Sequence, residues 1–183
     1  MKIGILSDTH DDIDNTNKAI DIFQENDVKA VIHACDIISP PVITEFYRLT
    51  EKGVELFGIF GNNDGEKRGL KNAFEIVGGE LLGDVGKIEL VGLKFCIYHG
   101  QDLKKKEKII KSRKFDVFIF GHTHTKYPKG VDTKIINDTI VLNPGTAHNV
   151  AKTFASDTQY FGESSIMIFD TTTKQFKFFD LGQ

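Results

Sequence analysis

The sequence has few cysteines and no long apolar run, and each shortage excludes a class of protein. Only two cysteines occur, Cys35 and Cys96, and both stand among apolar residues typical of strands. Such usage fits a reduced, cytoplasmic protein better than a domain held together by disulfides. No apolar run approaches the roughly 20 residues that span a bilayer, so no membrane segment is expected. Met1 and Lys2 lead directly into a short apolar strand, so no signal peptide is expected either.

A charge excess of one sign is also missing. The 23 Lys and Arg residues and 26 Asp and Glu residues give a formal net charge of −3, so binding to duplex nucleic acid is not expected. Residues 102–114 are locally basic, and two interpretations of this run stay open. It could form a phosphate-binding patch or, as charge runs more often do, the solvated face of a helix. Its basic residues are Lys104, Lys105, Lys106, Lys108, Lys111, Arg113 and Lys114.

The length of 183 residues corresponds to one domain of ordinary size. No internal repeat, low-complexity segment or interdomain linker interrupts the chain. A single domain over residues 1–183 is therefore predicted.

Strand and helix patterns alternate in the first half of the chain, which predicts an α/β fold with parallel strands. In the second half, strand pairs separated by turns predict hairpins. The stretch 149–163 lacks a clear period and is predicted to be a long loop, serving as a dimer contact or as a lid over substrate. Strands are expected at residues 2–7, 28–34, 54–60, 87–90, 93–98, 115–120, 133–136, 139–142, 165–170 and 175–180. Helices are expected near residues 14–26, from Pro40 to before Gly53, and near residues 67–77.

Polar side chains follow six of the predicted strands, at the point where each strand ends. Taken singly, an Asp there is commonly a helix cap, an Asn a turn residue and a His a hydrogen-bonded loop residue. In an open α/β sheet, however, ligands bind beyond the carboxyl ends of the strands, so these side chains are expected to converge. Imidazole is also the commonest metal ligand. The residues are Asp8, His10, Asp36, Asn62, His99, His122, His124 and Asn143.

The order of these motifs resembles that of the calcineurin-like metallophosphoesterases, and within them the small single-domain phosphodiesterases of bacteria and archaea. The resemblance runs from residue 3 to about residue 146. It implies a four-layer α-β-β-α sandwich in which two mixed sheets pack face to face with helices outside. The motifs are Asp8-Thr9-His10, Asp36, Gly61-Asn62-Asn63-Asp64, His99-Gly100 and Gly121-His122-Thr123-His124.

The same resemblance implies a centre of two metals bridged by Asp36. It assigns Asp8, His10, Asp36 and His124 to one metal, and Asp36, Asn62, His99 and His122 to the other. Asn63 and Asp64, which follow the Asn ligand, are the candidate catalytic residues.

The ligand chemistry agrees with this assignment. A mixed nitrogen and oxygen set suits Mn²⁺ foremost, with Ni²⁺, Fe²⁺, Co²⁺ and Zn²⁺ as alternatives, and the lack of Cys ligands argues against a structural zinc site. Two divalent cations, the carboxylates of Asp8 and Asp36 and one hydroxide leave a charge of about +1, which would attract a phosphodiester anion. Two ions about 3.5–4 Å apart can activate a shared water, so the expected nucleophile is a metal-bridging hydroxide.

Two departures from the family pattern stand out. The bridging aspartate usually follows a glycine, whereas Asp36 follows Cys35, which is expected to be a tolerated small apolar residue, with an additional soft ligand or an oxidisable thiol as alternatives. Many relatives also carry a histidine, thought to assist the leaving group, where this chain has Asn63. An amide cannot act as an acid, so low activity or a preference for good leaving groups is expected.

The expected function is hydrolysis of small phosphodiesters. One alternative is a protein-binding scaffold on the same fold, similar to the retromer scaffold subunit, with weak or no catalysis. Another is a phosphomonoester or protein phosphatase, which lacks support because Arg68 is the only arginine close to a motif. A homodimer is possible.

Overall fold

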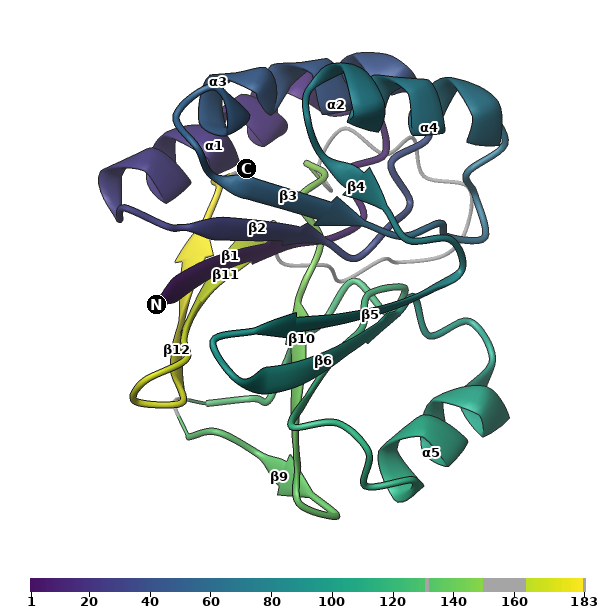
Figure 1. The fold of residues 1–183 in the computed structure, drawn as a ribbon, viewed down its shortest axis with the longest axis vertical. Helices are drawn as coiled ribbons and strands as arrows, with labels where there is room; N and C mark the ends of the chain where they lie inside the picture. The colour runs from purple at the N-terminus through teal and green to yellow at the C-terminus, as the bar shows by residue number, and fades with distance from the viewer. Residues whose placement is uncertain (131, 150–163, 183) are drawn as a thin grey trace.

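The computed structural model describes residues 1–130, 132–149 and 164–182. Its elements follow the predicted order, with helices and strands alternating in the first half of the chain and mostly strands in the second (Figure 1). The helices are α1 (Ile13–Glu25), α2 (Pro40–Glu45), α3 (Tyr47–Thr50), α4 (Lys67–Ile76) and α5 (Leu103–Lys111). The strands are β1 (Lys2–Leu6), β2 (Ala30–His33), β3 (Glu55–Gly58), β4 (Glu80–Leu81), β5 (Val85–Leu90), β6 (Leu93–Tyr98), β7 (Val117–Ile119), β8 (Lys126–Tyr127), β9 (Ile135–Ile136), β10 (Thr139–Pro144), β11 (Ser165–Asp170) and β12 (Gln175–Asp180).

The strands form two sheets, and both are mixed. The first has the order β12-β11-β1-β2-β3-β4, in which β1 to β4 are parallel and β11 runs antiparallel to both of its neighbours, β1 and β12. The second has the order β5-β6-β7-β10-β8, with β9 paired to β10. Within it β6, β7 and β10 run parallel, whereas β5, β8 and β9 run antiparallel to their partners.

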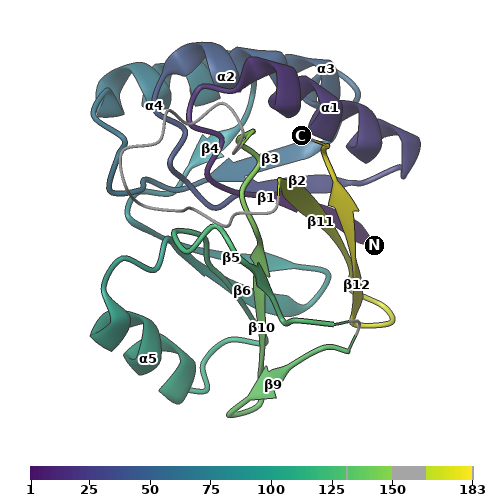
Figure 2. The same cartoon turned by 180° about the vertical axis from the view of Figure 1, so that it is seen from behind.

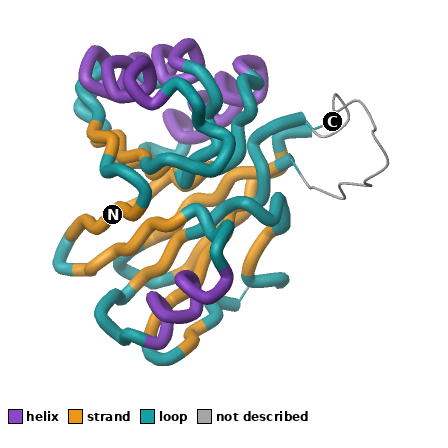
Figure 3. Tube along the Cα trace, turned by 90° about the vertical axis from the view of Figure 1, so that its right-hand side faces the viewer, coloured by secondary structure: helices purple, strands orange, loops and turns teal. Residues whose placement is uncertain are grey.

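Three apolar cores separate four layers. Phe23, Phe46 and Phe74 lie in the core between helices α1 to α4 and the first sheet. Residues such as Ile5 and Ile97 fill the core between the two sheets. A third core lies between the second sheet and α5, which stands on the side opposite to the other helices (Figures 1 and 2). The tube view shows the same stacking from the side (Figure 3). The predicted four-layer sandwich is confirmed.

The local signals act as expected at α1. Asp12 caps its first turn by accepting a hydrogen bond from the backbone N–H of Asn15 at 3.0 Å. Ala19, Ile20 and Phe23, spaced for one helical face, are fully buried. Burying such a face against the sheet is the main source of stability for a helix of this length.

The prediction of a single helix after Pro40 is wrong in one respect. The structure has two helices there, α2 and α3, divided at Phe46. The N–H of Phe46 bonds the carbonyl of Ile43, three residues back, at 3.1 Å, which tightens the turn. The strands β4 and β8 were not predicted. Each has only two residues, too few to show a periodic pattern.

The basic run of residues 102–114 contains α5, and its lysines divide into two groups. Lys104 and Lys108 are exposed, as the solvated-face interpretation expects. The ammonium groups of Lys105 and Lys106 instead lie over the rings of Tyr98 and Phe120, 4.6 and 4.4 Å from the ring centroids. These two lysines therefore cover aromatic rings of the third core.

Three remaining expectations concern the whole chain. Of the predicted loop 149–163, residues 150–163 lie outside the described residues. None of the described helices has the length and apolar character needed to cross a membrane. Cys35 and Cys96 are both free and buried.

Candidate metal centre

The loops that follow β1, β2, β6 and β7 are tied together by backbone hydrogen bonds. These bonds place the polar residues at the strand ends beside one another, in pairs that belong to the same sheet. They are donated by Asp8 to Cys35 at 2.8 Å, by His10 to Asp36 at 3.1 Å and by Gly121 to His99 at 3.0 Å.

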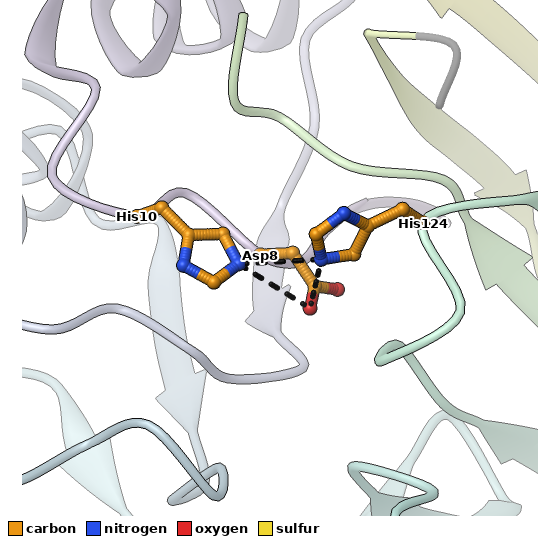
Figure 4. Close-up of side chains that lie close together, drawn as sticks. All are labelled: Asp8, His10 and His124. Carbon is orange, nitrogen blue, oxygen red and sulfur yellow. Dashed lines mark hydrogen bonds and ion pairs between the residues drawn. The ribbon is translucent and has the colours of Figure 1, made fainter. Parts of the chain in front are cut away.

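One group of candidate ligands consists of Asp8, His10 and His124, whose ligand atoms all lie within 4.8 Å of one another. Nε2 of His124 is 3.2 Å from Oδ1 of Asp8, and Nε2 of His10 is 3.9 Å from the same oxygen. The two Nε2 atoms are 3.2 Å apart (Figure 4). Two imidazole nitrogens and a carboxylate oxygen thus point toward one place, as first-row metal ligands do.

A second group consists of Asp8, Asp36 and His99, all buried, and its ligand atoms also lie within 4.8 Å of one another. Nε2 of His99 is 3.1 Å from Oδ2 of Asp36. Nδ1 of His99 lies 3.2 Å from the carbonyl oxygen of Ala34, to which it can only donate. A carbonyl partner on one imidazole nitrogen is the usual arrangement that directs the other nitrogen at a metal. Asp8 is common to both groups.

His122 and His124, two residues apart, separate between these groups. The ring centroid of His122 is 5.0 Å from that of His99, whereas that of His124 is 5.2 Å from that of His10. The backbone N–H of His122 also donates to Oδ2 of Asp8 at 3.1 Å. The ring contacts therefore place His122 beside His99 and His124 beside His10.

The turn after β3 also contacts Asp36. Asn63 donates to both oxygens of Asp36, from its backbone N–H at 3.0 Å and from its side-chain amide at 2.8 Å. Asn62, the residue before it, is exposed. Asp64 is 4% exposed, and its oxygens accept bonds from the backbone N–H groups of Ile37, Ile38 and Gly61 at 2.7–2.8 Å. Asp64 therefore joins the turns after β2 and β3.

Five of the seven candidate metal ligands have a backbone conformation that residues other than glycine rarely adopt. The φ angles of Asp8, His10, Asp36, His122 and His124 lie between +43° and +67°. Each costs about 1–3 kcal/mol, and such residues cluster at functional sites, where the surrounding structure holds them.

Glycines precede Asn62 and His122 because neighbouring polar side chains leave no room for a Cβ atom. A Cβ atom on Gly61 would collide with Oδ1 of Asp36, and one on Gly121 would collide first with Oγ of Ser7 and then with Oδ2 of Asp8. Neither glycine has a positive φ. The backbone at these two positions therefore packs directly against a carboxylate.

Cys35 stands in a glycine-like conformation, with φ +86°. Its side chain lies fully buried in the core between the sheets. Burial raises the pKa of its thiol well above the usual value, so the thiolate that could bind a metal or react with an oxidant is disfavoured. These observations support the interpretation of Cys35 as a tolerated small apolar residue.

Sequence reasoning missed His33, the last residue of β2, because it lies inside an apolar run. His33 is fully buried and joins the two loops that carry Asp8, His10 and Asp36. Its Nδ1 accepts the N–H of Cys35 at 3.2 Å, so the proton lies on Nε2, which faces Oγ1 of Thr9 at 3.1 Å. Burial lowers its pKa to about 3, so the ring is neutral.

Asn143, which sequence reasoning grouped with the other residues at strand ends, holds the loop of His122 and His124. Its amide nitrogen donates to the carbonyl of Gly121 and to Oγ1 of Thr123, each at 3.0 Å. Its oxygen accepts the N–H of Gly145 at 2.9 Å. With all three bonds made inside the protein, the side chain fixes a loop.

The electrostatics of the site suit a bound cation. Burial raises the pKa of Asp36, but the His99 imidazole and the N–H groups of Asn63 outweigh it and hold the pKa at about 2. Burial lowers the pKa of His99, yet the carboxylates of Asp36 and Asp8 raise it above its usual value overall. Burial lowers the pKa of His10 and of His122, so these rings keep their lone pairs.

The buried Nε2 of His99 is the observation that tests the fit most directly. Among the described residues it makes no hydrogen bond, although it lies 3.1 Å from an oxygen of Asp36. In neutral His99 the proton lies on Nδ1, which donates to the carbonyl of Ala34. Nε2 and the carboxylate of Asp36 would then face each other as two acceptors. A cation between them resolves that conflict, so the residues present fit a divalent metal.

Comparison with known proteins identifies related sequences and structures. The family model of the calcineurin-like phosphoesterase superfamily domain matches residues 1–174. The phosphodiesterase MJ0936 of Methanocaldococcus jannaschii is 42% identical over 146 residues, which are 79% of this chain and 83% of that protein.

Two solved structures extend the comparison. An archaeal phosphodiesterase superposes with a TM-score of 0.81 at 35% identity, covering 98% of this chain and 99% of its own. The zinc complex of Vps29 from Entamoeba histolytica superposes with a TM-score of 0.61 over the full length of both chains, at 15% identity, which shows a shared fold alone. The chain belongs to the calcineurin-like phosphoesterase superfamily.

Proposed function

We propose that this protein is a metal-dependent phosphodiesterase that hydrolyses small phosphodiesters at a centre of two metals. The observation that carries the proposal is the pair of ligand groups that share Asp8, one with His10 and His124 and one with Asp36 and His99. The similarity to a protein named a phosphodiesterase, over most of both chains, supports the same activity.

Asp8, His10, Asp36 and His124 would hold one metal, and Asp36, Asn62, His99 and His122 the other. This assignment makes Asp36 the bridge, although the residue common to the two ligand groups in the structure is Asp8. The division of ring contacts between the two histidine pairs supports this assignment. Because imidazole and carboxylate ligands suit first-row transition metals, Mn²⁺ is our first choice, with Ni²⁺, Fe²⁺, Co²⁺ or Zn²⁺ as alternatives.

When bound, two divalent cations supply an activated water and neutralise charge on the phosphate. The surrounding residues fix the ligands. Ala34 orients His99, Asn63 holds both oxygens of Asp36, and Asn143 holds the loop of the paired histidines. We assign Asp64 a positioning role, since both of its oxygens bind backbone N–H groups. The amide of Asn63 can donate a hydrogen bond to a phosphate oxygen but cannot protonate a leaving group.

A monoanionic diester suits the site better than a dianionic monoester. Arg68, the one arginine close to a motif, is exposed at the start of α4. Recognition of a phosphate dianion commonly uses bidentate arginine contacts. The scaffold alternative does not account for the convergence of five candidate ligands, Asp8, His10, Asp36, His99 and His124. We further propose that the protein works in the cytoplasm, since two free buried cysteines fit a reducing compartment.

The test is an activity panel with purified protein supplied with Mn²⁺. The substrates are bis(p-nitrophenyl) phosphate, p-nitrophenyl phosphate and a cyclic nucleotide. The diester should be cleaved faster than the monoester. Equal inactivity on all three substrates, with metals bound, would contradict the enzyme and favour the scaffold.

A further inference from the structure

A cavity of about 310 Å³ lies between α5 and the strands β8 to β10. Thr123 and Thr125 line it, so it shares with the metal centre the loop that carries His122 and His124. None of the candidate metal ligands is among the described residues that line it. Its volume falls at the lower end of the range of small-molecule sites, roughly 300–1,000 Å³.

The walls of the cavity are apolar and aromatic. Ile110 of α5 and Val141 of β10 supply aliphatic surface. The rings of Phe120 and Tyr127 also line it, with centroids 6.0 Å apart and planes tilted by 55°. Phe120 is almost fully buried beneath Lys106, so the partly exposed ring of Tyr127 is the surface against which a flat ligand can pack.

The charged groups that line the cavity are all cations. Lys106, Lys126 and Lys129 reach it, and no Asp or Glu is among its described lining residues. In a chain with a net charge of −3, such a local excess marks a place that favours anions. Lys126 forms an ion pair with Asp180, with its Nζ 2.6 Å from Oδ1 of the aspartate.

Lys106 is the cation best placed to receive an anion. Its ammonium group lies over the ring of Phe120, and no carboxylate of the described residues forms an ion pair with it. The adjacent Glu107 binds Lys111 instead, at 2.9 Å. Burial lowers the pKa of Lys106, which reflects the partial loss of water around its charge. A nearby phosphate would replace that water with a charged partner.

We propose that this cavity binds a nucleoside monophosphate, with its base against Tyr127 and its phosphate at Lys106 and Lys129. Lysine binds phosphate as a point charge, and a monophosphate carries the two features that the walls and the cations complement. The site is separate from the metal centre and does not depend on the proposed activity.

The test is calorimetric titration of metal-free protein, prepared with EDTA, with adenosine 5′-monophosphate. Saturable binding of one ligand per chain is expected, with adenosine and ribose 5-phosphate each about tenfold weaker or more, because each lacks one of the two contacts. Absence of binding would overturn the proposal, and so would equal affinity for either fragment.

Variants locate the ligand. Lys106→Ala should weaken binding about tenfold, and Lys129→Ala, in an exposed position that tolerates change, about threefold. Lys108→Ala, exposed on the same helix and not lining the cavity, is the matched control and should stay within about twofold. Asp36→Ala should leave binding unchanged. Equal weakening in Lys108→Ala, or loss of binding in Asp36→Ala, would place the ligand elsewhere and overturn the proposal.

Discussion

Nε2 of His99 lies 3.1 Å from Oδ2 of Asp36, while Nδ1 of the same ring faces the carbonyl oxygen of Ala34 at 3.2 Å. Both residues are almost fully buried. The carbonyl fixes which nitrogen carries the proton in the neutral ring, and so leaves a lone pair directed at a carboxylate. A proton on Nε2 or a metal cation can stand between these two atoms, and the proposed function takes a metal ion to be that partner.

The glycines beside the carboxylates give the first prediction. Gly61→Ala and Gly121→Ala should each push a ligand carboxylate out of place. The new Cβ atom would collide with Asp36 in the first variant, and with Asp8 and its hydrogen-bond partner Ser7 in the second. A displacement of about 1 Å at such a site costs roughly 10²-fold in rate. Diester hydrolysis and metal content should both fall. Gly65→Ala, where a Cβ meets nothing within 4 Å, is the control, and equal losses there would contradict the explanation.

Cys35 gives the second prediction, which concerns stability. At φ +86° glycine is the unstrained residue, so Cys35→Gly should be more stable than Cys35→Ala by about 1 kcal/mol, although both lose the buried sulfur. Urea unfolding measures the difference. At Cys96, inside strand β6, the order should reverse, because glycine weakens a strand. The same order at both positions would show that backbone strain is not the cause.

His33 gives the third prediction, which concerns pH. Its pKa is about 3 in the folded protein against 6.5 as the usual value, so between these values the unfolded chain binds the additional proton. The free energy of unfolding of metal-free protein should therefore decrease as the pH is lowered. From pH 6.5 to pH 5, this residue alone should reduce it by about 2 kcal/mol. Asp36, with a pKa of about 2, titrates below this window.

His33→Phe isolates that contribution. The variant keeps the ring shape but loses both hydrogen bonds, which should cost about 1–3 kcal/mol at pH 7. Its curve of unfolding free energy against pH should be flatter than that of the unaltered protein. His10 and His122, whose pKa values are also lowered, contribute equally to both curves. Parallel curves would refute the assignment of His33 as a neutral, buried link.

Asn63 gives the fourth prediction. Asn63→His should raise the rate selectively on diesters with poor leaving groups, by about 10²-fold if the new imidazole acts as a general acid. Asn63→Ala, which only removes the amide that holds Asp36, should lower the rate on all diesters alike. A series of substrates with graded leaving groups measures this. An equal change in rate on all leaving groups in Asn63→His would contradict the explanation that this chain lacks a general acid.

Much of the fold was predictable from local signals, because short apolar runs and helices with one apolar face specify their own structure. The alternation of strands and helices before Gly79 gave the parallel part of the first sheet, and paired runs gave the hairpins. The break at Phe46 and the two-residue strands β4 and β8 arise from tertiary packing, which leaves no periodic pattern in the sequence.

The part of the candidate site that lies directly after strands was predictable, because the carboxyl ends of parallel strands converge at one edge of a sheet. His33 was missed because a buried histidine inside an apolar run resembles any core residue until its partners are known. The positive φ angles of the ligands were hidden for a related reason. Asp and His commonly occur in ordinary turns, so only the assembled loops reveal the strain.

The most direct test of the dinuclear centre is the number of metal ions bound per chain. Protein loaded with Mn²⁺ and freed of excess metal should hold two ions per chain by elemental analysis. Asp36→Ala should lose bound metal together with diesterase activity, because it removes the ligand proposed to serve both ions. Asp27→Ala, at an exposed aspartate far from the site, is the control and should keep two. An Asp36→Ala variant that still held two ions per chain would contradict the account.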